Sequence, residues 1–258
     1  MSFEVDVTDG IATVTLNRPE ALNAIDPETR AELKQTWARI SQDDDIKVAV
    51  LTGAGEKAFC AGVDLKKTMP PTTSYGSEKF GSAESDHLFS SLVTDKPIIC
   101  AVNGYALGAG LELALACDIR IAAEGAQFAQ AEARWGTIPG AGGTQVLPRL
   151  VGESMANYML FTGNRIDAAT ALRTGLVSEV LPQAELKARA QEIARSILAC
   201  APLSVRAIKR LVGYSREAPG HIAHEVERLT WGLLRNSEDR IEGRRAFTEG
   251  RPPRFTGR

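Results

Sequence analysis

The chain has 258 residues, of which 44% are hydrophobic and 24% charged, and its formal net charge is −2. This is the composition of an ordinary globular protein, and the length allows one large domain or a domain with an appendage. The balanced charge provides no electrostatic attraction to nucleic acid or to acidic membranes, so neither is expected as a partner.

Cysteine usage and the amino-terminal residues bear on the compartment. Cys60, Cys100, Cys117 and Cys200 are widely spaced and form no C-x-x-C motif, a usage typical of a reducing compartment. No basic stretch followed by an apolar one opens the chain, and no apolar run reaches the length of a membrane span. We therefore expect a cytoplasmic protein.

The first half of the chain predicts short strands separated by turns. Runs of β-branched or wholly apolar residues predict strands at 11–16, 48–51, 98–102, 119–123 and 127–129. After the first strand, Asp26 and Pro27 predict the N-cap and first residue of a helix that ends near residue 40. Its buried face should comprise Leu33, Trp37 and Ile40.

Residues 66–87 are polar and rich in turn-forming residues, and they predict a loop with a weak helix at about 78–92. A loop of this length is typical of a lid or a binding segment, but a plain solvated connection fits the composition equally well.

The second half of the chain predicts mostly helices. They are expected at 143–151, 153–161, 167–174, 183–200, 202–213 and 219–235, with one strand at 177–180. This order favours a mixed α/β core that is followed by a helical carboxyl-terminal end. The last of these helices carries an apolar stripe, which could pack on its own domain or on a neighbouring subunit; its residues are Ile222, Val226, Leu229 and Leu233.

Several motifs of other enzyme classes are absent from the sequence. There is no H-E-x-x-H zinc motif, no P-loop, no G-x-G-x-x-G dinucleotide fingerprint and no G-x-S-x-G nucleophile elbow. The three histidines, His87, His221 and His224, do not have the spacing of a metal site. A dinucleotide site and a hydrolase triad are therefore unsupported by the residues.

Two glycine-rich turns, 57–65 and 103–112, follow two of the predicted buried strands. Small residues let backbone N–H groups approach a ligand closely, and the second turn opens directly into a helix whose first N–H groups lack partners. Two such turns side by side could bind one carbonyl oxygen as it becomes an enolate. The alternative is that these glycines only pack strands against helices.

Glu112 and Glu132 are the candidate acid–base residues. Glu112 interrupts an otherwise apolar segment, where burial would raise its pKa toward neutrality. It also stands in the first turn of a predicted helix, where a glutamate is favoured by the helix dipole alone. Glu132 follows the predicted strand at 127–129 and precedes a glycine-rich turn. Alone it would be an ordinary solvated glutamate, and it is a candidate only because the chain also has a second carboxylate and a glycine-rich turn at the end of each strand.

These residues resemble those of the enoyl-CoA hydratase (crotonase) family over essentially the whole chain. The matching segments include LNRPEALNA at 16–24, FCAGVDL at 59–65, KPIICAVNGYALGAG at 96–110 and GTIPGAGGTQ at 136–145. Shorter matches follow at 162–163, 175–177, 237–239, 242–243 and 246–249.

The resemblance implies a spiral of strand–strand–helix turns with a carboxyl-terminal helical trimerisation region. We expect the spiral core with the acyl-CoA site at 1–195 and the oligomerisation region at 196–258. A homotrimer or a dimer of trimers is implied, as is a place in fatty acid metabolism. Coenzyme A would enter as part of the substrate, with no separate cofactor.

The resemblance also implies the site. The backbone N–H groups of Val63 and Ala109 match the family's oxyanion hole, and Glu112 and Glu132 match the pair of glutamates that hold a water molecule in hydratases. Further residues are expected to contact the substrate or its coenzyme A part: Ala24, Ala61, Gly62, Asp64, Leu65, Gly108 and Gly140.

Two positions depart from the family's usual pattern. Ala109 stands where many hydratases have glycine, which keeps the backbone donor but adds a methyl group. Gly250 stands where many members carry a lysine that approaches the phosphates of coenzyme A, and Arg251 or another basic residue of the tail could replace it.

The resemblance leads to an enoyl-CoA hydratase that adds water reversibly across the 2,3 double bond of a 2-enoyl-CoA. Carnitinyl-CoA-type dehydration stays open, because those enzymes also keep both glutamates, whereas isomerases often keep one. A non-catalytic CoA-binding scaffold is a further alternative. Some relatives bind RNA through a lysine-rich helix, but here Glu28 and Glu32 interrupt the basic residues of the helix that begins at Pro27.

Overall fold

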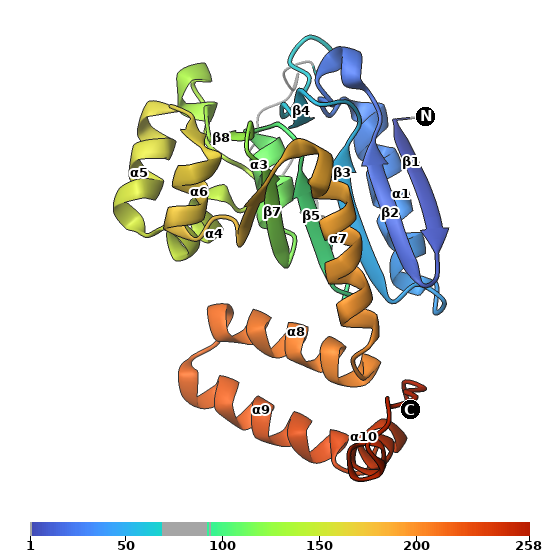
Figure 1. Ribbon diagram of the computed structural model, residues 1–258. Coiled ribbons are helices and arrows are strands. Elements are labelled where there is room, and N and C mark those ends of the chain that lie inside the picture. The colour runs from blue at the N-terminus through green and yellow to red at the C-terminus, as the bar shows by residue number, and fades with distance from the viewer. Residues whose placement is uncertain (1, 69–91, 93) are drawn as a thin grey trace.

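The computed structural model describes residues 2–68, 92 and 94–258 of the chain (Figure 1). The predicted loop at 66–87 and weak helix at 78–92 lie outside the described residues, apart from residues 66–68 and 92.

A six-stranded sheet in the order β1-β2-β3-β5-β7-β10 forms the centre of the fold. β1 pairs antiparallel with β2, and every other neighbouring pair is parallel. The strands span Phe3–Thr8 (β1), Ile11–Leu16 (β2), Val48–Gly53 (β3), Ile98–Val102 (β5), Ile119–Ala123 (β7) and Glu179–Leu181 (β10). All residues of β3 and β5 are buried, which explains why these strands are continuously apolar in sequence.

A second sheet of four short strands stands beside the first, in the order β4-β6-β8-β9. Its strands span Ala58–Cys60 (β4), Tyr105–Leu107 (β6), Gln127–Ala129 (β8) and Ile166–Asp167 (β9). β4, β6 and β8 each follow a strand of the large sheet after a short turn, so the strand–turn–strand unit recurs three times along the chain. This is the predicted crotonase-like α/β spiral.

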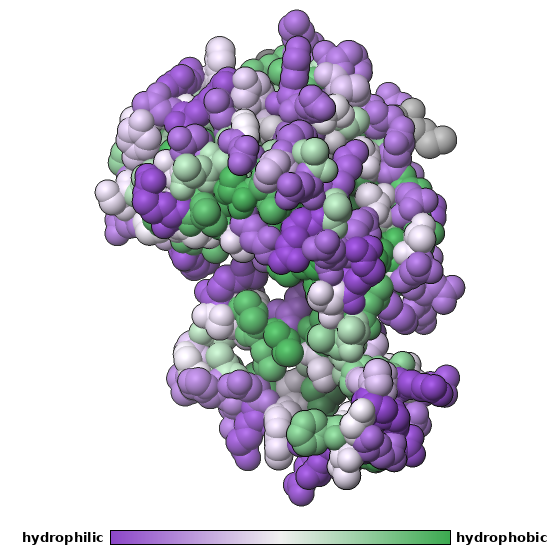
Figure 2. Space-filling view, in the orientation of Figure 1, coloured by the Kyte–Doolittle hydropathy of each residue, from purple (hydrophilic) through white to green (hydrophobic). Residues whose placement is uncertain are grey.

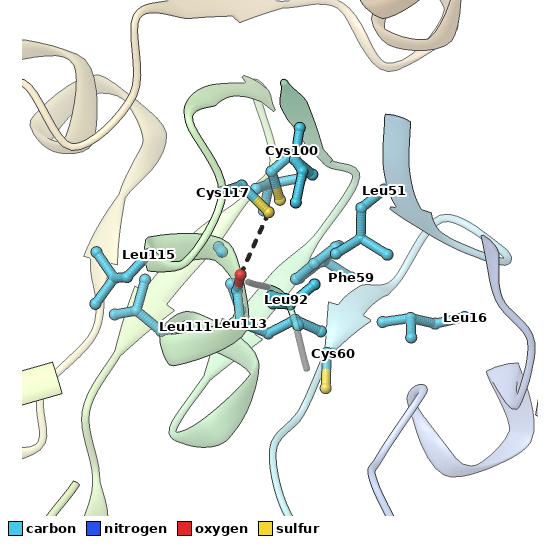
Figure 3. Packing of buried hydrophobic residues seen from close by; sticks show 14 of the residues in the cluster. Leu16, Leu51, Phe59, Cys60, Leu92, Cys100, Leu111, Leu113, Leu115 and Cys117 are labelled. Carbon is cyan, nitrogen blue, oxygen red and sulfur yellow. Dashed lines mark hydrogen bonds between the residues drawn. The ribbon is translucent and has the colours of Figure 1, made fainter. Parts of the chain in front are cut away.

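Helices cover both faces of the large sheet. α7 (Gln183–Leu198) packs Leu186, Ala190 and Ala194 onto one face. On the other face lie α1 (Pro27–Gln42) and α3 (Ala109–Leu115), within a larger apolar cluster whose packing around Cys100 and Cys117 is seen in Figure 3.

The start and the buried face of α1 are as predicted. The carboxylate of Asp26 accepts a hydrogen bond from the Thr29 N–H at 2.8 Å, which makes it the N-cap. Leu33, Trp37 and Ile40 are at most 1% exposed.

Five further helices lie in the second half of the chain. Their bounds are Gly143–Val151 (α4), Glu153–Thr162 (α5), Ala168–Thr174 (α6), Pro202–Glu217 (α8) and Gly220–Leu234 (α9), close to the predicted ranges. The strand predicted at 177–180 begins later, at Glu179. Leu176 and Val177 instead follow the left-handed Gly175 that ends α6, and they pack into the core.

Sequence reasoning missed β1, β4, β6, β9 and the final helix α10 (Glu238–Glu249). β4 and β6 fall inside segments interpreted as turns, and β9 falls at the start of the helix predicted at 167–174. α10 falls in the basic tail, where Ser237 acts as N-cap by accepting from the Arg240 N–H at 3.1 Å.

α8, α9 and α10 lie to one side of the α/β part and extend away from it (Figure 1). No residue of α8 or α9 is buried, and apolar side chains gather over α8 on the side that faces the α/β part (Figure 2). No helix within the described residues combines the length and apolar character that crossing a membrane requires.

Candidate active site

The two glycine-rich turns predicted from sequence lie against each other. The first follows β4, and its Gly62 has a φ of +98°, a left-handed conformation that favours glycine. A Cβ at Gly62 would lie 2.8 Å from the carbonyl oxygen of Leu107 and 3.5 Å from the nitrogen of Ala109. The second turn therefore approaches so closely only because residue 62 has no side chain.

Each turn presents one unpaired backbone donor. The N–H of Ile25 donates to the carbonyl of Gly62 at 2.8 Å and the N–H of Asp64 donates to the carbonyl of Ile25 at 2.9 Å, which leaves the intervening Val63 N–H outside the pairing. Ala109 is the first residue of α3, so its N–H has no intrahelical acceptor. Within residues 2–68, 92 and 94–258, neither N–H finds a hydrogen-bond acceptor.

Glu112 lies in the first turn of α3 and is 3% exposed. Its Oε1 accepts hydrogen bonds from the N–H groups of Ala141 at 2.7 Å and Gly143 at 2.9 Å, at the beginning of α4. Burial raises the pKa of the Glu112 carboxyl, and the two donated hydrogen bonds act in the opposite direction. The carboxylate is thus held in a defined place by backbone that cannot swing away.

Glu132 begins η3 (Glu132–Trp135), a short helical turn after β8. A Cβ at Gly108 would lie 3.2 Å from its Oε1, so the carboxylate lies directly beside the residue that precedes the Ala109 donor. Burial, together with the nearby charge of Glu112, raises the pKa of Glu132 to about 7. A carboxyl group with this pKa can both give and take a proton at neutral pH.

A cavity of about 880 Å³ brings these groups together. Its wall includes both glutamates, Val63 and Ala109. Of the residues predicted to contact substrate, it also includes Ala61, Gly62, Leu65, Gly108 and Gly140.

Ala24 and Asp64 are not among the residues that line this cavity. Arg18 connects them, because its guanidinium donates to the Ala24 carbonyl at 2.7 Å and to the Asp64 carboxylate at 3.3 Å. The same guanidinium lies 3.1 Å from the buried carboxylate of Asp26. These charged residues support the turn that carries Val63.

Several residues of the cavity escaped sequence reasoning. Trp135 and Ile138 line it although they are 71% and 72% exposed, and Arg134 lies beside them. The Arg134 guanidinium faces away from the glutamates: it donates to the Thr162 carbonyl at 2.7 Å and to the Asn164 side chain at 2.5 Å. The sequence did contain one indication of this part of the cavity wall, because Trp135 stands only three residues after the candidate Glu132.

The tail residue Arg251, a candidate for contacts with coenzyme A phosphates, is already engaged. Its guanidinium donates to Glu242 at 2.6 and 3.0 Å and to Glu249 at 2.6 Å. Among the described residues, no group of three or more His, Cys, Asp or Glu side chains could hold a metal ion.

Fold and site together bring two unpaired backbone donors and two carboxyl groups to one cavity, a set of groups that could stabilise an oxyanion and exchange a proton. Residues 6–258 match the family described as Enoyl-CoA hydratase/isomerase. The chain belongs to this family, the crotonase family.

Similar proteins agree with this assignment. An (E)-benzylidenesuccinyl-CoA hydratase from Thauera aromatica is 46% identical over 257 residues, which cover 100% of both chains. A carnitinyl-CoA dehydratase from Escherichia coli K12 is 41% identical over 267 aligned positions, covering 100% of this chain and 99% of the relative. The crystal structure of an enoyl-CoA hydratase from Bacillus anthracis superposes with a TM-score of 0.90 at 36% identity and covers 100% of both chains. The predicted enzyme class, a hydro-lyase of the crotonase family, is confirmed.

Proposed function

We propose that the protein adds water reversibly across the 2,3 double bond of a 2-enoyl-CoA thioester, with Glu112 and Glu132 as its acid–base pair. The observation that carries this proposal is the meeting of two half-buried or buried carboxyl groups and two unpaired backbone donors in one cavity. Coenzyme A would enter as part of the substrate.

The proposed role of the two turns is to bind the thioester oxygen. When the N–H groups of Val63 and Ala109 donate to it, the double bond is polarised and the β-carbon becomes electrophilic. The negative charge that develops on the oxygen in the transition state strengthens both hydrogen bonds, and each such donor contributes about 3–4 kcal/mol to catalysis.

The proposed role of the two glutamates is to hold and split one water molecule. Ionised Glu112 takes a proton from the water as its oxygen bonds to the β-carbon, and protonated Glu132 gives its proton to the α-carbon. The enzyme then carries its proton on Glu112 instead of Glu132, and return of that proton to Glu132 completes the cycle. Because both carboxyl groups would contact the same water, they would act as one coupled acid–base pair.

This reaction moves a proton and a hydroxyl group and transfers no electrons, so it needs no redox cofactor. The same groups run in reverse would dehydrate a 3-hydroxyacyl-CoA, which makes carnitinyl-CoA-type dehydration the second candidate. The full-length similarity to a carnitinyl-CoA dehydratase supports that candidate, and the similarity to a benzylidenesuccinyl-CoA hydratase supports a substituted acyl group.

We also propose that the protein is a homo-oligomer, a trimer or a dimer of trimers, assembled in the cytoplasm. α8 and α9 have no buried residue, yet α9 exposes large apolar side chains: Leu229 is 58%, Trp231 59% and Leu233 82% exposed. Helices of this length are stable mainly when such a face is packed against other protein.

The test is the loss of absorbance of the conjugated enoyl thioester, measured with crotonyl-CoA, for the wild type and the Glu112→Gln and Glu132→Gln variants. We expect turnover by the wild type and a loss of at least 100-fold in kcat for each variant, because each removes an acid–base group. A Glu56→Gln variant, altered at an exposed turn, is the matched control. Absence of turnover by a folded, CoA-binding wild type would contradict hydration of a simple 2-enoyl-CoA.

A further inference from the structure

Gln130 is a buried polar residue that the proposed mechanism does not use. It follows β8, is 1% exposed, and stands two residues before Glu132. Its amide nitrogen can lie 3.0 Å from Oε1 and 3.1 Å from Oε2 of Glu132, within hydrogen-bond distance of both.

The surroundings of the amide determine its orientation when Glu132 is ionised. With the carbonyl oxygen toward Glu132, that oxygen would face only acceptors and the nitrogen only donors. The opposite orientation satisfies both atoms, with the NH2 group donating to the carboxylate and the carbonyl facing donors. A buried amide that fails to satisfy its polar atoms is costly, so the donating orientation is the stable one beside an anion.

The structure assigns Gln130 as the positioning residue of Glu132: its amide holds the ionised carboxylate and stabilises it against its buried surroundings. This inference rests on the proposed function, in which Glu132 alternates between ionised and protonated forms. When Glu132 is protonated, the amide can keep this orientation and donate to the carbonyl oxygen of the carboxyl group, because in the opposite orientation its nitrogen would still face only donors.

The two glutamates are thereby held in different ways. Glu112 accepts from two backbone N–H groups, which can only donate and therefore favour its ionised form. Glu132 instead accepts from the side-chain amide of Gln130, which lies within hydrogen-bond distance of both of its oxygens. This difference suits Glu112 to the role of base and Glu132 to the role of the group that carries the transferable proton.

Apart from the dipole of the Gln130 amide, few charged groups within the described residues act on Glu132. Glu112 faces it from α3 and disfavours its ionisation, while the Arg134 guanidinium on η3 is turned toward Thr162 and Asn164. Gly143 leaves space for the side chains of Gln130 and Glu112, because a Cβ at residue 143 would lie 2.8 Å from the amide of Gln130 and 3.1 Å from Oε1 of Glu112. The cavity wall carries two further arginines, Arg30 and Arg165, and Arg165 donates to the side chain of Gln127 at 3.1 Å.

The test is Gln130→Met, which keeps the length of the side chain and removes the amide. In the proposed mechanism the alkaline limb of the kcat/KM profile reports the loss of the proton from Glu132. We expect this limb to move to higher pH by about one unit, since a hydrogen bond to a charged group is worth about that much or more. Gln130→Glu, which places a third carboxyl group beside Glu132, should move the limb in the same direction.

A direct titration separates this inference from the proposed function. In protein labelled with 13C at the glutamate carboxyl carbons, the signal of Glu132, assigned by its loss in Glu132→Gln, should titrate at higher pH in both Gln130 variants even if the enzyme hydrates no enoyl-CoA. Thr52→Val is the matched control, because it removes a buried hydroxyl that donates to the Ala101 carbonyl at 2.9 Å, away from both glutamates. A Glu132 titration unchanged in folded Gln130→Met or Gln130→Glu would overturn the assignment.

Discussion

The raised pKa of Glu132 lowers the stability of the folded protein at neutral and alkaline pH. Its pKa rises from a usual 4.5 to about 7 on folding, because burial and the neighbouring Glu112 disfavour the charge. Between these two pH values the folded protein binds more protons than the unfolded chain, so stability falls as the pH rises. The cost of the buried charge is complete above pH 7 and absent below about pH 4.5.

Replacing this carboxyl group should therefore stabilise the protein in a pH-dependent way. We expect Glu132→Gln to raise the free energy of unfolding by about 1–3 kcal/mol at pH 8, with the gain shrinking toward zero near pH 4.5. Chemical denaturation at several pH values measures this difference. Glu56→Gln in the exposed turn should show no such trend, and a gain for Glu132→Gln that did not vary with pH would refute the explanation.

At this scale the sequence indicated the glutamates but not their surroundings. Glu112 could be singled out because one charge interrupts an apolar helix, and a helix-dipole role could not be separated from burial until its backbone partners at Ala141 and Gly143 were visible. Gln130 gave no comparable signal, because its meaning depends on which atoms of a distant turn enclose its amide. Ala24 and Asp64 match family motifs, yet neither is among the residues that line the cavity.

At the scale of elements, the placing of α3 determines the site. α3 carries Glu112 and begins with the Ala109 donor, so its distance from β4 sets the position of both groups relative to the first turn. Gly110 permits the contact: a Cβ there would lie 2.0 Å from the carbonyl oxygen of Cys60. The nearest atoms are backbone atoms of Cys60, so no flexible side chain could move aside to make space for the added Cβ.

Gly110→Ala should accordingly push α3 away from β4. We expect a loss of about 3 kcal/mol or more in the free energy of unfolding, as for overpacking against rigid surroundings, together with loss of activity. Urea denaturation compares it with Gly125→Ala, where an added Cβ would meet nothing within 4 Å. Comparable stability of the two variants would show that the α3–β4 contact is not rigid.

The sequence predicted best the elements that have a clear local signature. β3 and β5 are continuous apolar runs and α1 has a capping Asp26, so local chemistry alone identifies them. β4, β6 and β9 have two or three residues each, and they exist because the spiral brings their edges together. Because the paired strands are far apart in the sequence, their pairing produces no periodic pattern of apolar residues within either strand.

At the scale of the whole molecule, the carboxyl-terminal helices are only loosely tied to the α/β part. A groove of about 1060 Å³ separates α8 from the large sheet, and polar contacts such as the ion pair between Lys209 and Asp118 at 2.8 Å bridge it. The end of the chain is bound within this region, since the buried carboxylate of Asp239 accepts from the N–H groups of Thr256 and Gly257 at 2.6 and 2.9 Å. The helices thus form a connected unit whose apolar side chains lack partners within the described part of one chain.

Self-association would bury these side chains, and a charge among them should prevent it. Leu233, 82% exposed on α9, is the most exposed residue of the predicted stripe, and Leu233→Asp would place an unpaired carboxylate in any interface formed there. We expect the wild type to sediment as an oligomer and Leu233→Asp to shift toward the 27.7 kDa single chain. His221→Asp adds the same charge near the start of α9, at an exposed residue outside the apolar stripe, and should leave the oligomer intact. Equal sedimentation of Leu233→Asp and the wild type would place the interface elsewhere, whereas dissociation with retained α/β secondary structure would tie assembly to the stripe on α9.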